Sequence, residues 1–275
     1  MAIPKTARMK EHLGKTAQVN HVAFSAPITW LRKGFADFMT CPLLALFYGS
    51  LFSIITYNFW TYLSASQSLH DVRVPLVGVV VLLLGPISAM SLYDGSKRIQ
   101  SGAKPALKDV LLSAFKANGS CPSIFLSVML IVLAIMWMMF SPLIYAVFNT
   151  GSLNIVSTDQ TIVEAILSEI TSGGNIGFLV AYSIFTAIMG LTAFMISWFS
   201  FPMVLDRDVD PFTATSTSLK AAMANKIVMF IWAPTVGALV LLSLMTPYFI
   251  GLSLVIPIIG HSTWHAYKDM VGDLK

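Results

Sequence analysis

Residues 122–148 read PSIFLSVMLIVLAIMWMMFSPLIYAVF, a run of 27 residues without one charged side chain. A helix rises about 1.5 Å per residue and needs about 20 residues to cross the roughly 30 Å of hydrocarbon in a bilayer. This run therefore predicts a membrane-spanning helix. Because it is longer than one crossing needs, we expect it to tilt, to bend or to project beyond the hydrocarbon layer. The whole chain has the same character, since 56% of its 275 residues are apolar and only 11% are charged. Such a composition is typical of a membrane protein.

Five more apolar runs accompany this one, and none of the six contains Asp, Glu, Lys or Arg. The last two are separated by Pro247, which removes a backbone donor, so we expect two spans there rather than one very long helix. The predicted spans are Pro42–Ser64, Val74–Tyr93, Pro122–Phe148, Ile176–Leu205, Ile227–Leu244 and Tyr248–Trp264.

Basic residues lie almost entirely in alternate segments between these spans. Of the 17 Lys and Arg residues, only Arg73 falls in the three segments on the opposite side. Cytoplasmic loops retain Lys and Arg, so this pattern predicts six spans with both termini in the cytoplasm. The net charge of +4 then describes a basic rim facing anionic headgroups, and it does not indicate a nucleic-acid partner.

Three short segments on the cytoplasmic side each begin directly after a proline. They are Ile28–Phe38, Ala106–Ala117 and Phe212–Ala224. Proline suits the first helical position, and Asp210 offers an N-cap to the third segment. We expect these segments to be amphipathic helices in the inner membrane interface.

These segments reveal an internal repeat. Gly34–Pro42 aligns without gaps on Ala114–Pro122, whereas Asn225–Lys226 replaces the Cys-Pro pair in the third copy. The sequence predicts an all-α membrane protein: six transmembrane helices as three repeats of interfacial amphipathic helix plus transmembrane hairpin. A polar basic tail, residues 1–26, precedes one domain, residues 27–275, with repeat units at about 27–104, 105–210 and 211–275.

Four residues could bind a metal ion at the cytoplasmic level. His261 and His265 are spaced i, i+4 on the last span, a spacing that suits a metal or an axial haem ligand, and Cys41 and Cys121 lie at comparable depth. The alternative is that both histidines bond to carbonyls or neighbour headgroups, and that each cysteine is a small packing residue. No catalytic or nucleotide-binding motif occurs, so we expect no enzyme activity and assign no cofactor.

The densest group of charges, Asp206–Asp210, follows the fourth span. Its position before a proline-initiated helix favours an N-cap and salt-bridge turn. A contact with a divalent cation or a partner protein is the alternative.

Three stretches resemble a known family: Leu84–Pro86 followed by Ser91–Asp94, then Phe201–Asp208, then Gly260–His265. They are similar to an uncharacterised family of predicted integral membrane proteins, found mostly in proteobacteria, of which some members carry labels resembling cytochrome c oxidase subunits. The resemblance implies a bacterial inner-membrane location and no established activity. It also suggests an accessory role in a respiratory complex.

Three functions remain open at this point. The leading interpretation is a non-catalytic accessory, assembly or scaffold subunit whose partners are the lipid bilayer and other integral membrane proteins. A passive channel or small-molecule facilitator is the second, and it requires polar residues converging on an axial cavity. The third is a metal- or haem-carrying subunit.

Overall fold

Long helices dominate the structure, a computed structural model that describes residues 17–65, 89–110, 121–148, 176–207 and 209–274. Within these residues, five helices are long and apolar enough to cross a membrane, judged by length and composition. They are Pro42–Tyr62, Pro122–Phe148, Ile176–Asp206, Lys226–Leu244 and Pro247–Met270. The prediction of an all-helical membrane protein is confirmed at this level. The remaining predicted span, Val74–Tyr93, lies outside the described residues except for its last five positions, where a helix continues to residue 100.

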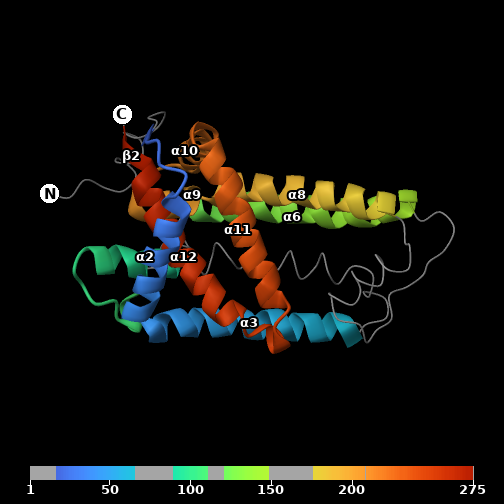
Figure 1. Cartoon of the computed structure of the whole chain (residues 1–275), viewed down its shortest axis with the longest axis horizontal. Coiled ribbons are helices and arrows are strands. Elements are labelled where there is room, and N and C mark those ends of the chain that lie inside the picture. The colour runs from blue at the N-terminus through green and yellow to red at the C-terminus, as the bar shows by residue number, and fades with distance from the viewer. Residues whose placement is uncertain (1–16, 66–88, 111–120, 149–175, 208, 275) are drawn as a thin grey trace.

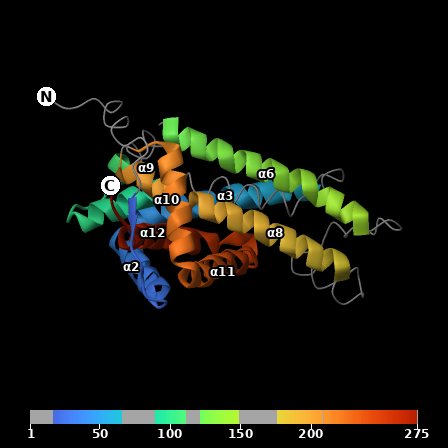
Figure 2. The same cartoon turned by 90° about the horizontal axis from the view of Figure 1, so that it is seen from above.

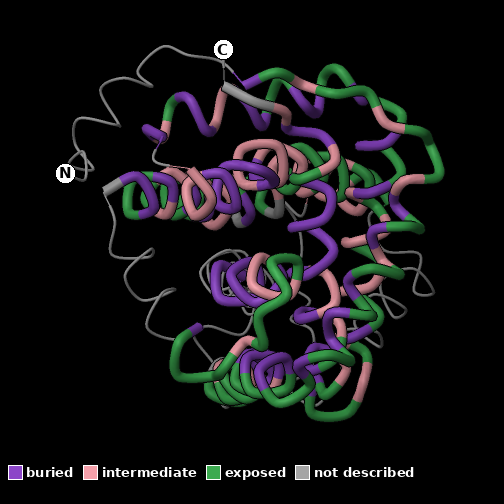
Figure 3. Tube along the Cα trace, turned by 90° about the vertical axis from the view of Figure 1, so that its left-hand side faces the viewer, coloured by how far each residue is buried: buried purple, intermediate pink, exposed green. Residues whose placement is uncertain are grey.

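The long helices fall into two directions. In Figure 1, α3 (Pro42–Ala65), α6 (Cys121–Phe148) and α8 (Ile176–Ser197) run along the long axis of the molecule. Figure 1 also shows α11 (Lys226–Leu244) and α12 (Leu252–Met270) inclined to that axis. A short turn, η2 (Pro247–Phe249), connects these two inclined helices. Figure 3 shows buried and exposed positions alternating along several helices, which therefore turn one face inward.

The fourth predicted span is interrupted near its end. Its first part is α8, and its last part is a separate helix, α9 (Ser200–Asp206). Pro202 explains the break, because its ring would clash with the carbonyl of Trp198 in a continuous helix. The predicted span Ile176–Leu205 is therefore made of two consecutive helices.

Two of the three proline-initiated segments are helices with nearly the predicted bounds. They are α2 (Ala26–Thr40) and α10 (Pro211–Ala224), and they lie across the long helices at one end of the molecule (Figures 1 and 2). Asp210 caps α10 as predicted, because its carboxylate accepts from the backbone N–H groups of Phe212 and Thr213. The middle segment is helical over residues 107–110, and its residues 111–117 lie outside the described residues.

Close backbone approaches hold α12 against its neighbours. A Cβ atom at Gly34 of α2 would lie 2.1 Å from Oγ of Ser262, and one at Gly49 of α3 would lie 2.1 Å from the carbonyl oxygen of Ser253. Small residues at helix crossings permit such contacts, which drive association inside a bilayer. Glycine is thus required at both crossings, and α12 becomes the helix around which α2 and α3 assemble.

The two chain ends pair with each other. Strand β1 (Ala17–Val19) runs antiparallel to β2 (Val271–Leu274). Asn225 adds a bridge, since its side chain accepts from the backbone N–H of Val22 and donates to the carbonyl of Asn20. Part of the segment predicted to be a polar tail is therefore folded onto the domain, and both described ends lie on one side.

Candidate functional site

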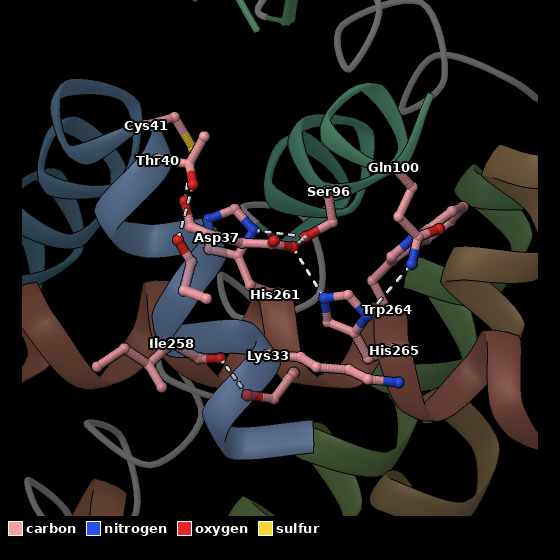
Figure 4. Close-up of polar contacts among 12 residues, drawn as sticks. Lys33, Asp37, Thr40, Cys41, Ser96, Gln100, Ile258, His261, Trp264 and His265 are labelled. Atoms are coloured by element: carbon pink, nitrogen blue, oxygen red, sulfur yellow. Dashed lines mark hydrogen bonds and ion pairs between the residues drawn. The ribbon is translucent and has the colours of Figure 1, made fainter. Parts of the chain in front are cut away.

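Both predicted histidines lie in the most enclosed part of the molecule. The last turns of α12 bury every residue from Gly260 to Tyr267. His261 is fully buried and His265 is 7% exposed. Their rings point toward Asp37 on α2 and toward Ser96 and Gln100 on the helix of residues 89–100 (Figure 4).

A continuous hydrogen-bond network joins these side chains. Oγ of Ser96 lies 2.6 Å from Oδ2 of Asp37 and 2.8 Å from Nδ1 of His261. Nε2 of His265 lies 2.9 Å from the same Asp37 oxygen, and its Nδ1 lies 3.2 Å from Nε2 of Gln100. The indole of Trp264 donates to Oε1 of Gln100 at 3.0 Å. We call these six residues the α12 network.

The ends of the α12 network fix the direction of every bond in it. Trp264 can only donate, so Gln100 presents its carbonyl to the indole and its amide N–H to His265. His265 therefore accepts at Nδ1 and donates from Nε2 to Asp37. The hydroxyl of Ser96 donates its one proton to Asp37. The oxygen of Ser96 therefore accepts a hydrogen bond from Nδ1 of His261. In this arrangement His265 carries a proton at Nε2, and His261 carries one at Nδ1.

Asp37 is the one carboxylate of the α12 network. Burial by itself would raise the pKa of this carboxyl, but hydrogen bonds from His265 and Ser96 outweigh burial and hold its pKa below the ordinary value. Nε2 of His261 is buried and has no hydrogen-bond partner among the described residues. The centre of the network is thus a buried carboxylate that accepts from Ser96 and His265, and one imidazole nitrogen beside it has no partner among the described residues.

The four predicted metal ligands are only partly brought together. His261 and His265 share the α12 network, and Cys41 lies beside it, with Sγ donating to the carbonyl of Asp37 at 3.2 Å. Burial raises the pKa of the Cys41 thiol to about 11, with a further contribution from the Asp37 charge. The side chain of Cys121 lies outside the described residues. Among the side chains that are described, no three His, Cys, Asp or Glu residues could hold a metal ion. The four-ligand site stays a prediction.

The Asp206–Asp210 turn forms a second polar group at the same end. Asp206 is within 2.9 Å of Nζ of Lys97 and 3.2 Å of Nζ of Lys268, and it accepts from the hydroxyl of Tyr267 at 3.1 Å. Arg207 donates to the carbonyls of Val271 and Gly272. With the Asp210 cap, these contacts agree with the interpretation as an N-cap and salt-bridge turn.

Sequence reasoning missed Asp37, Ser96 and Gln100. All three lie outside the predicted spans, where polar residues attract no notice. The available signal was spacing, because Ser96 and Gln100 are separated by four residues, as are His261 and His265. Two helices running parallel bring such pairs face to face, and both contacts indeed join residues 165 apart.

These features define an integral membrane protein built of helices, with a buried network of polar side chains at one end. Residues 74–206 match the model of a family described as "Predicted integral membrane protein (DUF2189)". The resemblance predicted from the sequence to such a family is confirmed for this part of the chain. The match includes Ser96 and Gln100 but not α2 or α12, which carry the rest of the network. No curated protein and no solved structure matches the chain.

Proposed function

We propose that this protein is a non-catalytic accessory, assembly or scaffold subunit of a larger complex in the bacterial inner membrane. The observation that carries the proposal is a regular ridge of exposed side chains on α8, the helix of the least buried candidate span. In the most apolar 18-residue window of each helix, 61% of positions are buried in the span of α12 but only 6% in the span of α8 and α9. One side of the molecule therefore offers a large apolar surface.

The exposed face of α8 has the form of a packing ridge. Ile176, Val180, Ile184 and Ile188 recur every four residues, and each is more than half exposed. β-branched side chains are stiff, and rows spaced by four residues are the ridges that fit the grooves of another helix. Inside a bilayer, such shape complementarity drives helix association. This ridge supports docking of a partner helix.

The α12 network supports a structural role over a catalytic one. Most of its donors and acceptors bond one another, and its members are enclosed by α2, α12 and residues 89–100. A substrate would have to displace bonds that hold three helices together. A respiratory complex is proposed as the partner on the strength of the family resemblance alone.

The proposed topology has six spans in three repeats, with both termini in the cytoplasm. Residues 34–48 and 218–232, offset by 184, have the same buried or exposed class at each of the 15 positions. The residues that end the two short helices have similar backbone angles. Cys41, after α2, has φ −133° and ψ 60°, and Asn225, after α10, has φ −121° and ψ 47°. Each cap side chain donates to the carbonyl four residues before it. Pairing of β1 with β2 supports placing both ends on one side.

Mass measurement of the native complex tests the proposal. The full-length protein is extracted from its membranes in mild detergent, as wild type, Ile184→Trp and Leu241→Trp. Leu241 is a matched control because it is an exposed residue on the different helix α11. We expect a partner to co-purify with the wild type and with Leu241→Trp, and to be lost from Ile184→Trp at unchanged folded yield. A monomer in every preparation, or equal loss from both variants, would contradict the proposal.

A further inference from the structure

The helices α2 and α10 carry apolar side chains on the face turned away from the core. Each has three such residues, spaced by seven and then four positions. On α2 they are Ile28, Phe35 and Met39, and on α10 they are Phe212, Leu219 and Met223, all between 36% and 70% exposed. Each residue on α2 has its counterpart on α10 exactly 184 positions later. We call the two sets the α2 stripe and the α10 stripe.

Each stripe continues directly into the exposed face of the long helix that follows. Beyond the α2 stripe, α3 exposes Leu43, Leu46 and Phe47, and beyond the α10 stripe, α11 exposes their counterparts Ile227, Phe230 and Ile231. Phe212 also contacts Phe125 of α6, with ring centroids 5.1 Å apart. The stripes are therefore continuous with the apolar surface of the predicted membrane spans.

Positive charge accompanies both stripes. Arg32 and Lys33 are exposed on α2, and Lys220 and Lys226 are exposed on and just after α10. The acidic residue within α2 is Asp37, which is buried, and α10 contains none; Lys33 is 3.8 Å from Asp269 of α12, and this pair is exposed at the surface. A helix with an outward apolar face flanked by Lys and Arg is typical of one lying in the headgroup region of an anionic leaflet.

Aromatic residues lie at the other end of α3, next to the turn η2, and the length of α3 between them and the α2 stripe can be compared with the thickness of a bilayer. Tyr57 contacts Tyr248, and Trp60 contacts Phe249, with ring centroids 5.3 and 6.1 Å apart. Such aromatic clusters are typical of a membrane interface. From Leu43 to Trp60, α3 rises about 26 Å at 1.5 Å per residue. That rise matches the hydrocarbon thickness of a bilayer, which places the stripes at the other interface.

We propose that the α2 and α10 stripes bury their apolar side chains at one common depth in an anionic lipid leaflet, with the four basic residues contacting its phosphates. The partner of this surface is the lipid headgroup layer. Two features favour lipid over a protein partner. Both stripes continue into the exposed faces of α3 and α11, and the same pattern of side chains occurs twice, 184 positions apart.

Spin-label depth measurements on the full-length protein test this proposal. Labels are placed at Met39→Cys and Met223→Cys in a Cys41→Ala/Cys121→Ala background that retains the wild-type folded yield. The protein is reconstituted in vesicles of phosphatidylcholine, with or without phosphatidylglycerol. Collision rates with oxygen and with a water-soluble nickel complex then report depth. Lys104→Cys, in an exposed loop, is the aqueous reference, and Leu51→Cys, on the exposed face of α3 about half-way between Leu43 and Trp60, is the acyl-chain reference.

We expect the two labels to show the same depth, between those of the two references. Lys220→Glu combined with Lys226→Glu should move the Met223 label toward water in vesicles containing phosphatidylglycerol, and leave it unchanged in phosphatidylcholine alone. Labels as accessible to nickel as Lys104→Cys would overturn the proposal, because the stripes would then face water. Labels shielded from both reagents would overturn it too, since protein would then cover them. An equal response in both lipids would overturn the role of the charges.

Discussion

The helices α12 and α8 are both candidate spans, yet they occupy opposite environments. The span of α12 has a mean hydropathy of 1.2 and 61% of its window buried, whereas the span containing α8 has a mean hydropathy of 2.0 and 6% buried. The less hydrophobic helix is thus inside the protein, and the more hydrophobic one is outside. This is the reverse of the arrangement in a soluble protein, where apolar helices are buried.

The contrast follows from the solvent. Lipid tails are as apolar as Leu, so a Leu-rich face gains little by turning inward, while His, Ser and Thr need protein partners for their polar groups. The span containing α3 agrees, because its mean hydropathy of 1.4 is the second lowest and its buried share of 39% is the second highest. The two candidate spans with the lowest mean hydropathy are thus the two with the largest buried share, whereas the three more hydrophobic spans do not follow this order among themselves.

The largest effect is expected from a pair of glycine substitutions that separates the two environments. Gly34→Leu would force side-chain atoms into the backbone of α12, since even a Cβ there lies 2.7 Å from the backbone nitrogen of Ser262. We expect almost complete loss of folded protein, measured by size-exclusion chromatography in detergent, because overpacking by one methylene already costs about 1–3 kcal/mol. Gly190→Leu on α8 is the control, as a Cβ there meets nothing within 4 Å. Similar losses from both would remove the distinction between α12 and α8.

A smaller loss is expected when the α12 network loses its acceptor. Asp37→Ala leaves the donors of Ser96 and His265 buried without a partner, which should cost about 1–3 kcal/mol for each of the two donors. Asp37→Asn keeps an acceptor and should cost less, about 1–3 kcal/mol. Thr192→Val on α8 removes a single bond to the carbonyl of Ile188 and should change stability by less than about 0.5 kcal/mol. Thermal unfolding in one detergent would check this ranking, which equal effects of Asp37→Ala and Thr192→Val would contradict.

Much of the fold could be predicted from the sequence because membrane helices obey simple constraints. Charge-free runs of sufficient length, and prolines before Ile28 and Phe212, located the long and short helices within a few residues. The α12 network could not be predicted in this way. It depends on which helices become neighbours, and this is set by close contacts such as Gly34 with Ser262. The pairing of β1 with β2 also depends on local geometry that periodicity does not encode, whereas Pro202 was a signal in the sequence for the break at Trp198.

The stability of the protein should depend on pH through Asp37 of the α12 network, and substitutions on α8 should not change that dependence. The pKa of Asp37 is held below its ordinary value of 3.8, so its contribution is complete above that pH and is lost as pH falls through the lower folded-state pKa. We expect wild type to lose stability below about pH 4 more steeply than Asp37→Asn, in which this carboxyl is absent. Thr192→Val should keep the wild-type slope. Unfolding temperatures measured between neutral and acidic pH provide the test, and identical slopes for wild type and Asp37→Asn would exclude a role for this carboxyl.

The smallest effect concerns reactivity rather than stability. Cys41 ends α2 beside the α12 network, is 7% exposed and has its pKa raised from 9.0 to about 11. That rise of two units lowers the thiolate fraction near pH 8 about 100-fold, and the thiolate is the reactive form. In a Cys121→Ser background, Cys41 should therefore react with iodoacetamide at least about 100-fold more slowly than a cysteine introduced at the exposed Lys104 in a Cys41→Ala/Cys121→Ser background. Adding Asp37→Asn should accelerate the reaction, because it removes the neighbouring charge and loosens the contact between α2 and α12. A rate for Cys41 equal to that at position 104 would mean that the junction opens freely, so α12 would be no better enclosed than α8.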